Sequence, residues 1–308
     1  MNRLLVTGAS GLLGINLALR ESAHRDVIGV THSHSLTGVP FNVRQVNLTA
    51  DGAIARMIEE IRPDVVIHCA AMADIDSCEK QPEQAELVNS VVPGVLADIC
   101  DKQDIRLVHL STDAVFDGTR GDYLETDSPH PLSVYAQTKL KGEQAVLDAC
   151  PDAIVARVNF YGWSLTGKRS LAEFFYNNLS AGHTVNGFTD VEFCPLFVNH
   201  LADLLMSLAD SYHTGLFHVV SPVSLSKYEF GCRIANAFGF DDHLINPVSV
   251  KNGGLVARRS PKLTLNTDKL KDALQIVLPG VEEGIHAFFE QYLTGFPRKL
   301  QEYLKRSE

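Results

Sequence analysis

The chain has 308 residues, of which 45% are hydrophobic and 21% charged, and its formal net charge at neutral pH is −10. These values describe a globular protein with a full-sized core and exclude disordered and collagen-like chains. The acidic balance argues against nucleic-acid binding, because phosphate contacts need a basic surface. The longest uncharged stretch near the N-terminus, residues 4–19, is too short and polar to span a bilayer and does not resemble a signal peptide. We therefore expect a cytoplasmic protein without membrane contact.

Six cysteines are widely spaced and form neither a C-x-x-C pair nor a Cys/His cluster at zinc-binding spacing. This usage is typical of reduced thiols in a cytoplasmic protein. The 12 histidines are equally scattered. We therefore predict reduced cysteines and no metal site.

The first predicted strand, Arg3–Thr7, leads into the glycine-rich segment TGASGLLG at residues 7–14, within which a helix begins. Gly8 allows a sharp turn, Gly11 lets the backbone approach a pyrophosphate, and Gly14 lets the helix lie close to the sheet. The positive end of that helix would face the anion. The spacing is G-x-x-G-x-x-G, and its place in the first strand–turn–helix of a βαβ series predicts a dinucleotide-binding site.

The second predicted strand, Asp26–Thr31, ends without the acidic residue that favours NAD by bonding the ribose hydroxyls. The segment that follows continues with His32 and Ser33 and contains no carboxylate before residue 51. A 2′-phosphate would meet no repulsion there, and hydroxyl and imidazole groups could donate hydrogen bonds to it. No arginine follows immediately, so the sequence favours NADP(H) and leaves NAD(H) as the alternative.

The next elements continue the alternation of strands and helices. Strands are predicted at residues 43–47, 64–70, 105–111 and 153–158, and helices at 50–61, with Thr49 as its N-cap, and at 84–100. Such alternation is typical of a parallel sheet covered on both faces. We therefore predict an α/β fold built on a Rossmann-type, doubly wound sheet.

Three polar residues in chain order indicate chemistry on a carbonyl or an alcohol. Tyr135 and Lys139 share one face of a predicted helix because they are four residues apart. A lysine ammonium beside a tyrosine would lower the phenol pKa from about 10 toward neutrality and so assist proton exchange. Thr112 ends a central strand, at the sheet edge where open α/β sheets place their sites. We predict that these three residues are catalytic.

Beyond residue 160 the pattern becomes irregular, with apolar segments at 171–179 and 198–209, a strand at 216–220, and helices near 227–238 and 281–293. We predict a dinucleotide-binding domain over residues 1–160, to which 195–222 returns, and a smaller mixed α/β substrate lobe over 161–308. Residues 251–308 contain ten Lys/Arg against seven Asp/Glu. This basic tail predicts an anion site at Arg258 and Arg259, with an ordinary solvated surface as the alternative.

Four motifs, in their order along the chain, resemble the extended short-chain dehydrogenase/reductase superfamily: TGASGLLG at 7–14, HCAA at 68–71, STDAVFDG at 111–118 and YAQTK at 135–139. Within that superfamily the chain is most similar to the dTDP-4-dehydrorhamnose reductases, strongly to about residue 162 and weakly beyond. The resemblance implies that Thr112, Tyr135 and Lys139 form the catalytic triad.

The resemblance also implies two sets of binding residues. The cofactor set comprises Gly8, Ser10, Gly11, Leu12, Leu13, Gly14, Thr31, His32, Ser33, Asn47, Leu48, Cys69, Ala70, Ala71, Ala73, Tyr135 and Lys139. The substrate set comprises Asp113, Val115, Phe116, Asn159, Arg258 and Arg259. The chain departs from the family at residues 189–196, where only the proline of the family segment D-Q-x-G-x-P-T is kept. Substrate specificity is therefore the open part of the prediction.

The resemblance leads to a functional hypothesis: NADP(H)-dependent reduction of the C4 keto group of a nucleotide-linked 6-deoxy-4-keto sugar. A dehydratase would need a glutamate after Asp113, where this chain has Ala114. Two alternatives stay open, a sugar-nucleotide epimerase and a non-catalytic regulatory subunit similar to the methionine adenosyltransferase β subunit. The expected partner is the sugar nucleotide, and a homodimer is left open.

Overall fold

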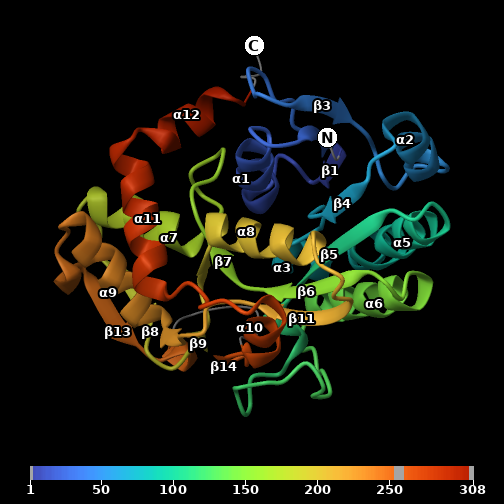
Figure 1. Cartoon of the computed structure of the whole chain (residues 1–308). Helices are drawn as coiled ribbons and strands as arrows, with labels where there is room; N and C mark the ends of the chain where they lie inside the picture. Colours follow the sequence, from blue (N-terminus) through green and yellow to red (C-terminus); the bar gives the residue numbers. More distant parts are fainter. Residues whose placement is uncertain (1–2, 253–259, 305–308) are drawn as a thin grey trace.

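The computed structural model describes residues 3–252 and 260–304, and a parallel β-sheet forms its centre (Figure 1). Within the described residues this sheet has seven strands in the order β11-β6-β5-β4-β1-β2-β3. The order reverses direction at β1, which is the mark of a doubly wound sheet, so the predicted fold class is confirmed. The strands are β1 (Arg3–Thr7), β2 (Asp26–Thr31), β3 (Asn42–Gln45), β4 (Val65–His68), β5 (Arg106–Thr112), β6 (Ile154–Val158) and β11 (Gly215–Val219).

Successive residues of the central strands point into two separate cores, as the pleat of a strand requires. In β1, Leu4 and Val6 belong to one core and Leu5 to the other, and all three are fully buried. Strands that are buried on both faces produce the near-continuous apolar runs seen in the sequence. Because both faces are covered, only the ends of the strands are open to ligands.

Helices cover both faces of the sheet. On one face lie α2 (Ala53–Ile61), α5 (Val92–Lys102) and α6 (Val134–Ala149). On the other lie α1 (Leu12–Glu21) and α8 (Val198–Ala209), which contact each other near the middle of the molecule (Figure 1). The core beneath this second pair continues into the part of the chain that follows residue 160.

The helix predicted from residue 50 begins three residues later than expected. Gly52, at φ +65°, is the N-cap of α2, and Thr49 is not. Instead, the Thr49 backbone N–H and hydroxyl both donate to Asn47 Oδ1, at 3.1 and 2.7 Å. The local turn made by the asparagine competes with helix initiation at this point.

The helix predicted over residues 84–100 is not one regular helix. It is divided into α4 (Pro82–Glu86), a π-helical turn η1 (Leu87–Val91) and α5. Pro93 has no N–H to donate to the Asn89 carbonyl four residues earlier, so the α-helical hydrogen-bond pattern is interrupted there. Gly142 of α6 packs on the freed carbonyl, where a Cβ would lie 2.2 Å from the oxygen. The Asn89 side chain, in this wide turn, accepts a hydrogen bond from the Met72 N–H at 2.8 Å.

The remaining elements are mostly short and lie mainly after residue 160. They are α3 (Ile75–Lys80), η2 (Asp113–Val115), β7 (Phe160–Tyr161), α7 (Leu171–Ser180), β8 (Val185–Phe188), β9 (Glu192–Phe193), β10 (Leu196–Phe197), β12 (Leu225–Ser226), α9 (Lys227–Phe238), η3 (Asp242–Leu244), β13 (Ile245–Val248), η4 (Val250–Asn252), β14 (Lys262–Leu263), α10 (Asp268–Leu274), α11 (Val281–Leu293) and α12 (Phe296–Glu302). In the described chain β7 pairs with β10, β9 with β12 and β14, and β8 with β13. The division into two lobes at residue 160 stays a prediction.

The C-terminal helices connect the later part of the chain to the early strands. Trp163 stacks on Phe288 of α11, with ring centroids 4.0 Å apart. Beyond α12, the Tyr303 carbonyl accepts a hydrogen bond from the Thr37 N–H, in the segment between β2 and β3. Figure 1 shows that the chain runs from α12 toward β3. None of the described helices is long and apolar enough to cross a membrane.

Candidate active site

The glycine-rich turn has a tight geometry that only glycine accommodates at two of its three positions. Gly8 adopts φ +67°, and a Cβ there would lie 2.8 Å from the Ala70 nitrogen. A Cβ on Gly14 would lie 2.3 Å from the Gly8 carbonyl oxygen. Gly11 has an extended backbone and forms the N-cap of α1 with no side-chain cap, so the first N–H groups of the helix face outward from the turn.

A cavity of about 380 Å³ opens beside this turn, at the carboxyl ends of β1, β2 and β4. That volume and position suit a small-molecule or cofactor site. Eleven residues of the predicted cofactor set line it: Gly8, Ser10, Gly11, Thr31, His32, Ser33, Asn47, Leu48, Cys69, Ala70 and Ala71. The rest of that set lies outside this lining, namely Leu12, Leu13, Gly14, Ala73, Tyr135 and Lys139.

The cavity lining has few charges. Among the described residues that line it, none is an aspartate, a glutamate or a lysine. The Thr31 hydroxyl at the end of β2 is buried and has no hydrogen-bond partner in the described structure. His32 and Ser33 follow it and are exposed. The lining therefore offers neutral hydrogen-bonding groups without repulsion of an anion.

The lining also contains residues that sequence reasoning missed: Val30, Val46, Thr49, Met72, Gln84, Val88 and Arg169. Thr49 directly follows the predicted cofactor residues Asn47 and Leu48, so its place in the sequence could have indicated that it lines the cavity. Gln84 and Val88 are four residues apart, a spacing that could have indicated a shared face. Arg169 lies in the loop before α7, and its local sequence contains no feature that connects it to the cavity.

The three predicted catalytic residues come together from two adjacent elements. Thr112 ends β5, and α6, which begins after the Ser133 N-cap, carries Tyr135 and Lys139. The Thr112 side chain lies near enough to the Tyr135 hydroxyl to lower its pKa, against the larger effect of burial. The Lys139 Nζ is 3.4 Å from His109 Nε2 and donates a hydrogen bond to the Leu110 carbonyl.

The pKa of Tyr135 is not lowered by Lys139, although the sequence led us to expect this. Burial raises the pKa of Tyr135 to about 12, and Lys139 is not among the groups that influence it. Burial lowers the pKa of Lys139 to about 8. The reason for the difference is geometric, because the Lys139 ammonium is directed to the Leu110 carbonyl. Tyr135 is therefore a neutral phenol that can donate a proton.

The predicted catalytic residues are linked to the cavity lining by buried polar contacts that sequence reasoning did not predict. Asn89 Nδ2 donates to the Met72 carbonyl at 3.0 Å and to Thr138 Oγ1 at 3.1 Å, which links the cavity lining to α6. The Thr7 hydroxyl lies 2.7 Å from His68 Nδ1, and the His68 ring stacks on His109. Burial, followed by the nearby Lys139 charge, lowers the pKa of His68 to about 3, so that ring is neutral.

A buried ion pair fixes α6 against the sheet. Arg157 of β6 donates two hydrogen bonds to the Glu143 carboxylate, at 2.7 and 2.9 Å, and both side chains are almost completely buried. Ser111 of β5 donates to the same carboxylate at 2.5 Å. Removing one partner of such a pair typically costs about 3–5 kcal/mol, because a buried charge is left alone. The cluster therefore holds the helix that carries Tyr135 in one position.

The predicted substrate residues have different environments. Asn159 Nδ2 donates to the buried Asp113 carboxylate at 2.6 Å, and burial raises the pKa of Asp113 to about 6. Val115 and Phe116 are fully buried in a small core cluster, which leaves no exposed surface for a ligand. Arg258 and Arg259 lie outside the described residues.

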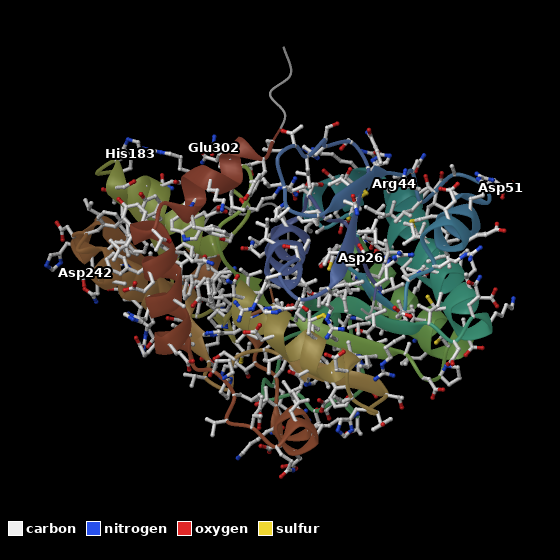
Figure 2. All side chains as sticks on the ribbon, turned by 45° about the horizontal axis from the view of Figure 1, so that its top comes forward. Asp26, Arg44, Asp51, His183, Asp242 and Glu302 are labelled. Atoms are coloured by element: carbon white, nitrogen blue, oxygen red, sulfur yellow. The ribbon has the colours of Figure 1, made fainter. Side chains whose placement is uncertain are left out.

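Among the described residues one group has side chains near enough to one another to hold a metal ion. Asp241, Asp242 and His243 place their ligand atoms within 4.8 Å of one another. Asp242 lies at the outer edge of the molecule in Figure 2, on the side opposite Asp51. Exposed acidic groups commonly lie this close without an ion, so the group carries no functional argument.

The doubly wound sheet, the glycine-rich turn and the Thr–Tyr–Lys arrangement define an NAD(P)-dependent oxidoreductase of the extended short-chain dehydrogenase/reductase type. A family model described as the RmlD substrate binding domain matches residues 1–294. The chain therefore belongs to this family, and the resemblance inferred from the motifs is confirmed.

Three relatives and one solved structure illustrate the range of the family. The probable low-salt glycan biosynthesis reductase Agl14 of Haloferax volcanii is 36% identical over 92% of this chain and 95% of its own length. A dTDP-4-dehydrorhamnose reductase of Mycobacterium tuberculosis is 36% identical over 80% of this chain and 79% of its own. Methionine adenosyltransferase 2 subunit beta of Xenopus laevis is 31% identical over 83% of this chain and 78% of its own length. The structure of dTDP-4-dehydrorhamnose reductase from Bacillus anthracis in complex with NADP is 25% identical and matches with a TM-score of 0.84, covering 94% of this chain and all of that chain.

Proposed function

We propose that this protein reduces the C4 keto group of a nucleotide-linked 6-deoxy-4-keto sugar and uses NADP(H) as its reductant. The observation that carries the proposal is the neutral Tyr135 phenol, held against Thr112 at the same sheet edge as the glycine-lined cavity. Relatives named as reductases, at 36% identity, support the choice of reaction.

The cavity fits a dinucleotide. No side chain projects from Gly8 or Gly11, so a pyrophosphate can approach the backbone N–H groups at the start of α1. The exposed His32 and Ser33 follow the end of β2, where the adenosine ribose and its 2′-phosphate would bind. With no carboxylate in the described lining, the cavity favours NADP(H) over NAD(H).

In the proposed reaction, each residue of the triad has one role. When bound, the nicotinamide supplies a hydride to the carbonyl carbon. Tyr135 donates its proton to the carbonyl oxygen, and its pKa of about 12 keeps it protonated until that step. The Thr112 hydroxyl stabilises the negative charge that develops on the same oxygen. Lys139, whose ammonium donates to the Leu110 carbonyl and does not lower the pKa of Tyr135, would bind the cofactor.

We assign the substrate to the region beside the carboxyl end of β5. Asn159 and Asp113 meet there, and their hydrogen bond keeps two polar groups fixed near the triad. The lobe over residues 161–308 would supply the remaining contacts, with 195–222 returning to the sheet. We propose that Arg258 and Arg259 bind the nucleotide diphosphate, because guanidinium groups suit phosphate.

A panel of 4-keto sugar nucleotides with dTDP, UDP and GDP tests the proposal. The expected result is stoichiometric NADPH oxidation with at least one member. NADPH that stays unoxidised with every member, while a sugar nucleotide is epimerised or none binds, would reject the reductase assignment.

One alternative has a specific observation in its favour. Methionine adenosyltransferase 2 subunit beta is 31% identical to this chain, so a regulatory subunit is the second candidate. A stable complex with an adenosyltransferase, together with no NADPH oxidation, would favour it. The retained Tyr135 and Lys139 support the reductase, because a purely regulatory subunit needs no proton donor.

A further inference from the structure

Arg169 is the only residue with a permanent charge in the described lining of the cofactor cavity. Its side chain is exposed, and among the described residues its guanidinium makes no hydrogen bond or ion pair. The protein as a whole is acidic, with a formal net charge of −10. A single unpaired arginine in an otherwise neutral cavity is therefore a local attraction for an anion.

The backbone at Arg169 is held in place by a buried carboxylate. Glu173 of α7 is fully buried and accepts hydrogen bonds from the Arg169 N–H at 2.8 Å and the Ser170 N–H at 3.1 Å. It also accepts from the Ser164 N–H and hydroxyl, at 2.6 and 2.9 Å. Both ends of the loop 164–170 are thereby fixed to one side chain. A fixed backbone reduces the entropy lost when the Arg169 side chain orders on a ligand.

The same loop is fixed to the helix that starts at the glycine turn. Asn16 of α1 donates from Nδ2 to the Trp163 carbonyl at 2.9 Å, one residue before the loop begins. The loop therefore keeps a constant position relative to Gly11, at the helix end that attracts phosphate. The lining of the same cavity includes the exposed Ser33, which follows β2, where a 2′-phosphate would lie.

We propose that Arg169 binds a phosphate group of the dinucleotide, so that the later part of the chain supplies the one permanent cation in the described lining of the cavity. A guanidinium can donate two parallel hydrogen bonds to a phosphate, which a lysine cannot. The inference rests on the NADP(H) part of the proposed function. No sequence motif indicates Arg169 as a cofactor residue. Its local positive charge would help an acidic protein to bind a polyanion.

The test compares the wild type with Arg169→Ala and with a matched control, Lys168→Ala. Lys168 is an exposed cation in the same loop, but it does not line the cavity. NADPH and NADH are titrated separately without substrate, by calorimetry and by the fluorescence of Trp163, the chain's one tryptophan. We expect Arg169→Ala to weaken NADPH binding at least tenfold and to reduce its dependence on salt, while Lys168→Ala binds as the wild type does.

The outcomes distinguish binding of the 2′-phosphate from binding of the pyrophosphate. They also distinguish failure of the inference on Arg169 from failure of the proposed function. Loss of affinity for NADPH alone supports binding of the 2′-phosphate, and equal loss for both dinucleotides supports binding of the pyrophosphate. Wild-type affinity in Arg169→Ala overturns the inference, as does an equal loss in Lys168→Ala, which would indicate a general effect of net charge. If the wild type binds neither dinucleotide, the proposed function fails together with the inference, whereas binding without keto reduction leaves the result on Arg169 interpretable.

Discussion

Burial acts in opposite directions on two residues that lie one helical turn apart. It raises the pKa of Tyr135 to about 12 and lowers that of Lys139 to about 8, because it disfavours the charged form of each. For a reductase this is the useful direction for the tyrosine, since the proton must still be present when the carbonyl oxygen gains charge. The lysine is close to losing its proton at neutral pH, and this makes its state sensitive to the pH of the experiment.

Replacing Tyr135 with Phe removes the proposed proton donor and keeps the ring. We expect kcat to fall by roughly 10²–10⁴, the range typical of lost general acid catalysis, with little change in NADPH affinity. The control is Tyr212→Phe, because Tyr212 is completely exposed. Steady-state kinetics and a binding titration check both parts, and a Tyr135→Phe enzyme that keeps its rate would exclude the mechanism.

The pKa of Lys139 gives a prediction for the pH profile. With a pKa of about 8 in place of the ordinary 10.5, Lys139 is an ammonium below pH 8 and loses its charge above it. We expect kcat/KM for NADPH, which reports on the free enzyme, to fall as the pH rises through about 8. Tyr135 stays protonated over this range and adds no step of its own. A profile that falls only above pH 10 would show that the charge of Lys139 does not control kcat/KM for NADPH. A Lys139→Met enzyme with a profile of unchanged shape would show the same.

At the scale of elements, the start of α1 combines a fixed turn with an open helix end. Gly11 has an extended backbone that any residue can adopt, and a Cβ there would lie 3.1 Å from the Gly8 carbonyl oxygen, a close contact that a small local shift can relieve. Its requirement for glycine therefore comes mainly from the space that the ligand needs. We expect Gly11→Val to fold and to lose dinucleotide binding, because the branched side chain would occupy the phosphate position.

A matched control for Gly11→Val is Gly280→Val. Gly280 is also a helix N-cap with an extended backbone, and a Cβ there meets no atom within 4 Å. Calorimetry with NADPH and a thermal melt of both variants check the prediction. Near-normal NADPH affinity in Gly11→Val would contradict the placement of the pyrophosphate at this turn.

The elements that could be predicted are those whose burial dictates their pattern. The central strands of the sheet are mainly apolar because both faces are covered, and α8, α9 and α11 begin and end where the sequence pattern changes. The π-helical turn at 87–91 could not be predicted from periodicity, because it depends on Pro93 and on the approach of Gly142. The two-residue strands β7, β9, β10, β12 and β14 are too short to leave a pattern.

For the site, the sequence predicted groups that are close along the chain and missed those that only the fold brings together. The glycine turn, Thr112 and the Tyr135–Lys139 pair each belong to a local motif. Arg169 reaches the cavity only through the folded loop, and His109 and Asn89 act from buried positions. The neutral state of Tyr135 follows from burial, which the spacing of Tyr135 and Lys139 does not reveal.

At the scale of the whole molecule, the two parts of the chain share one core. The aromatic packing around Trp163 and Phe288 is continuous with the core beneath α1 and α8. The contact of Tyr303 with Thr37 brings the C-terminal end to the strands that flank the cavity. Large motions of one part against the other are therefore not the default expectation, because such an interface is apolar and extensive.

The most direct test of the central claim is the fate of a deuterium label. NADPH that carries deuterium in both positions at C4 of its nicotinamide is mixed with a 4-keto-6-deoxy sugar nucleotide in a single turnover, and the sugar product is analysed by mass spectrometry and NMR. Hydride transfer to the keto carbon predicts one deuterium at C4 of the sugar for each NADP⁺ formed. A sugar product without deuterium, or NADPH that stays unoxidised while the keto sugar is bound or epimerised, would contradict the assignment as a reductase.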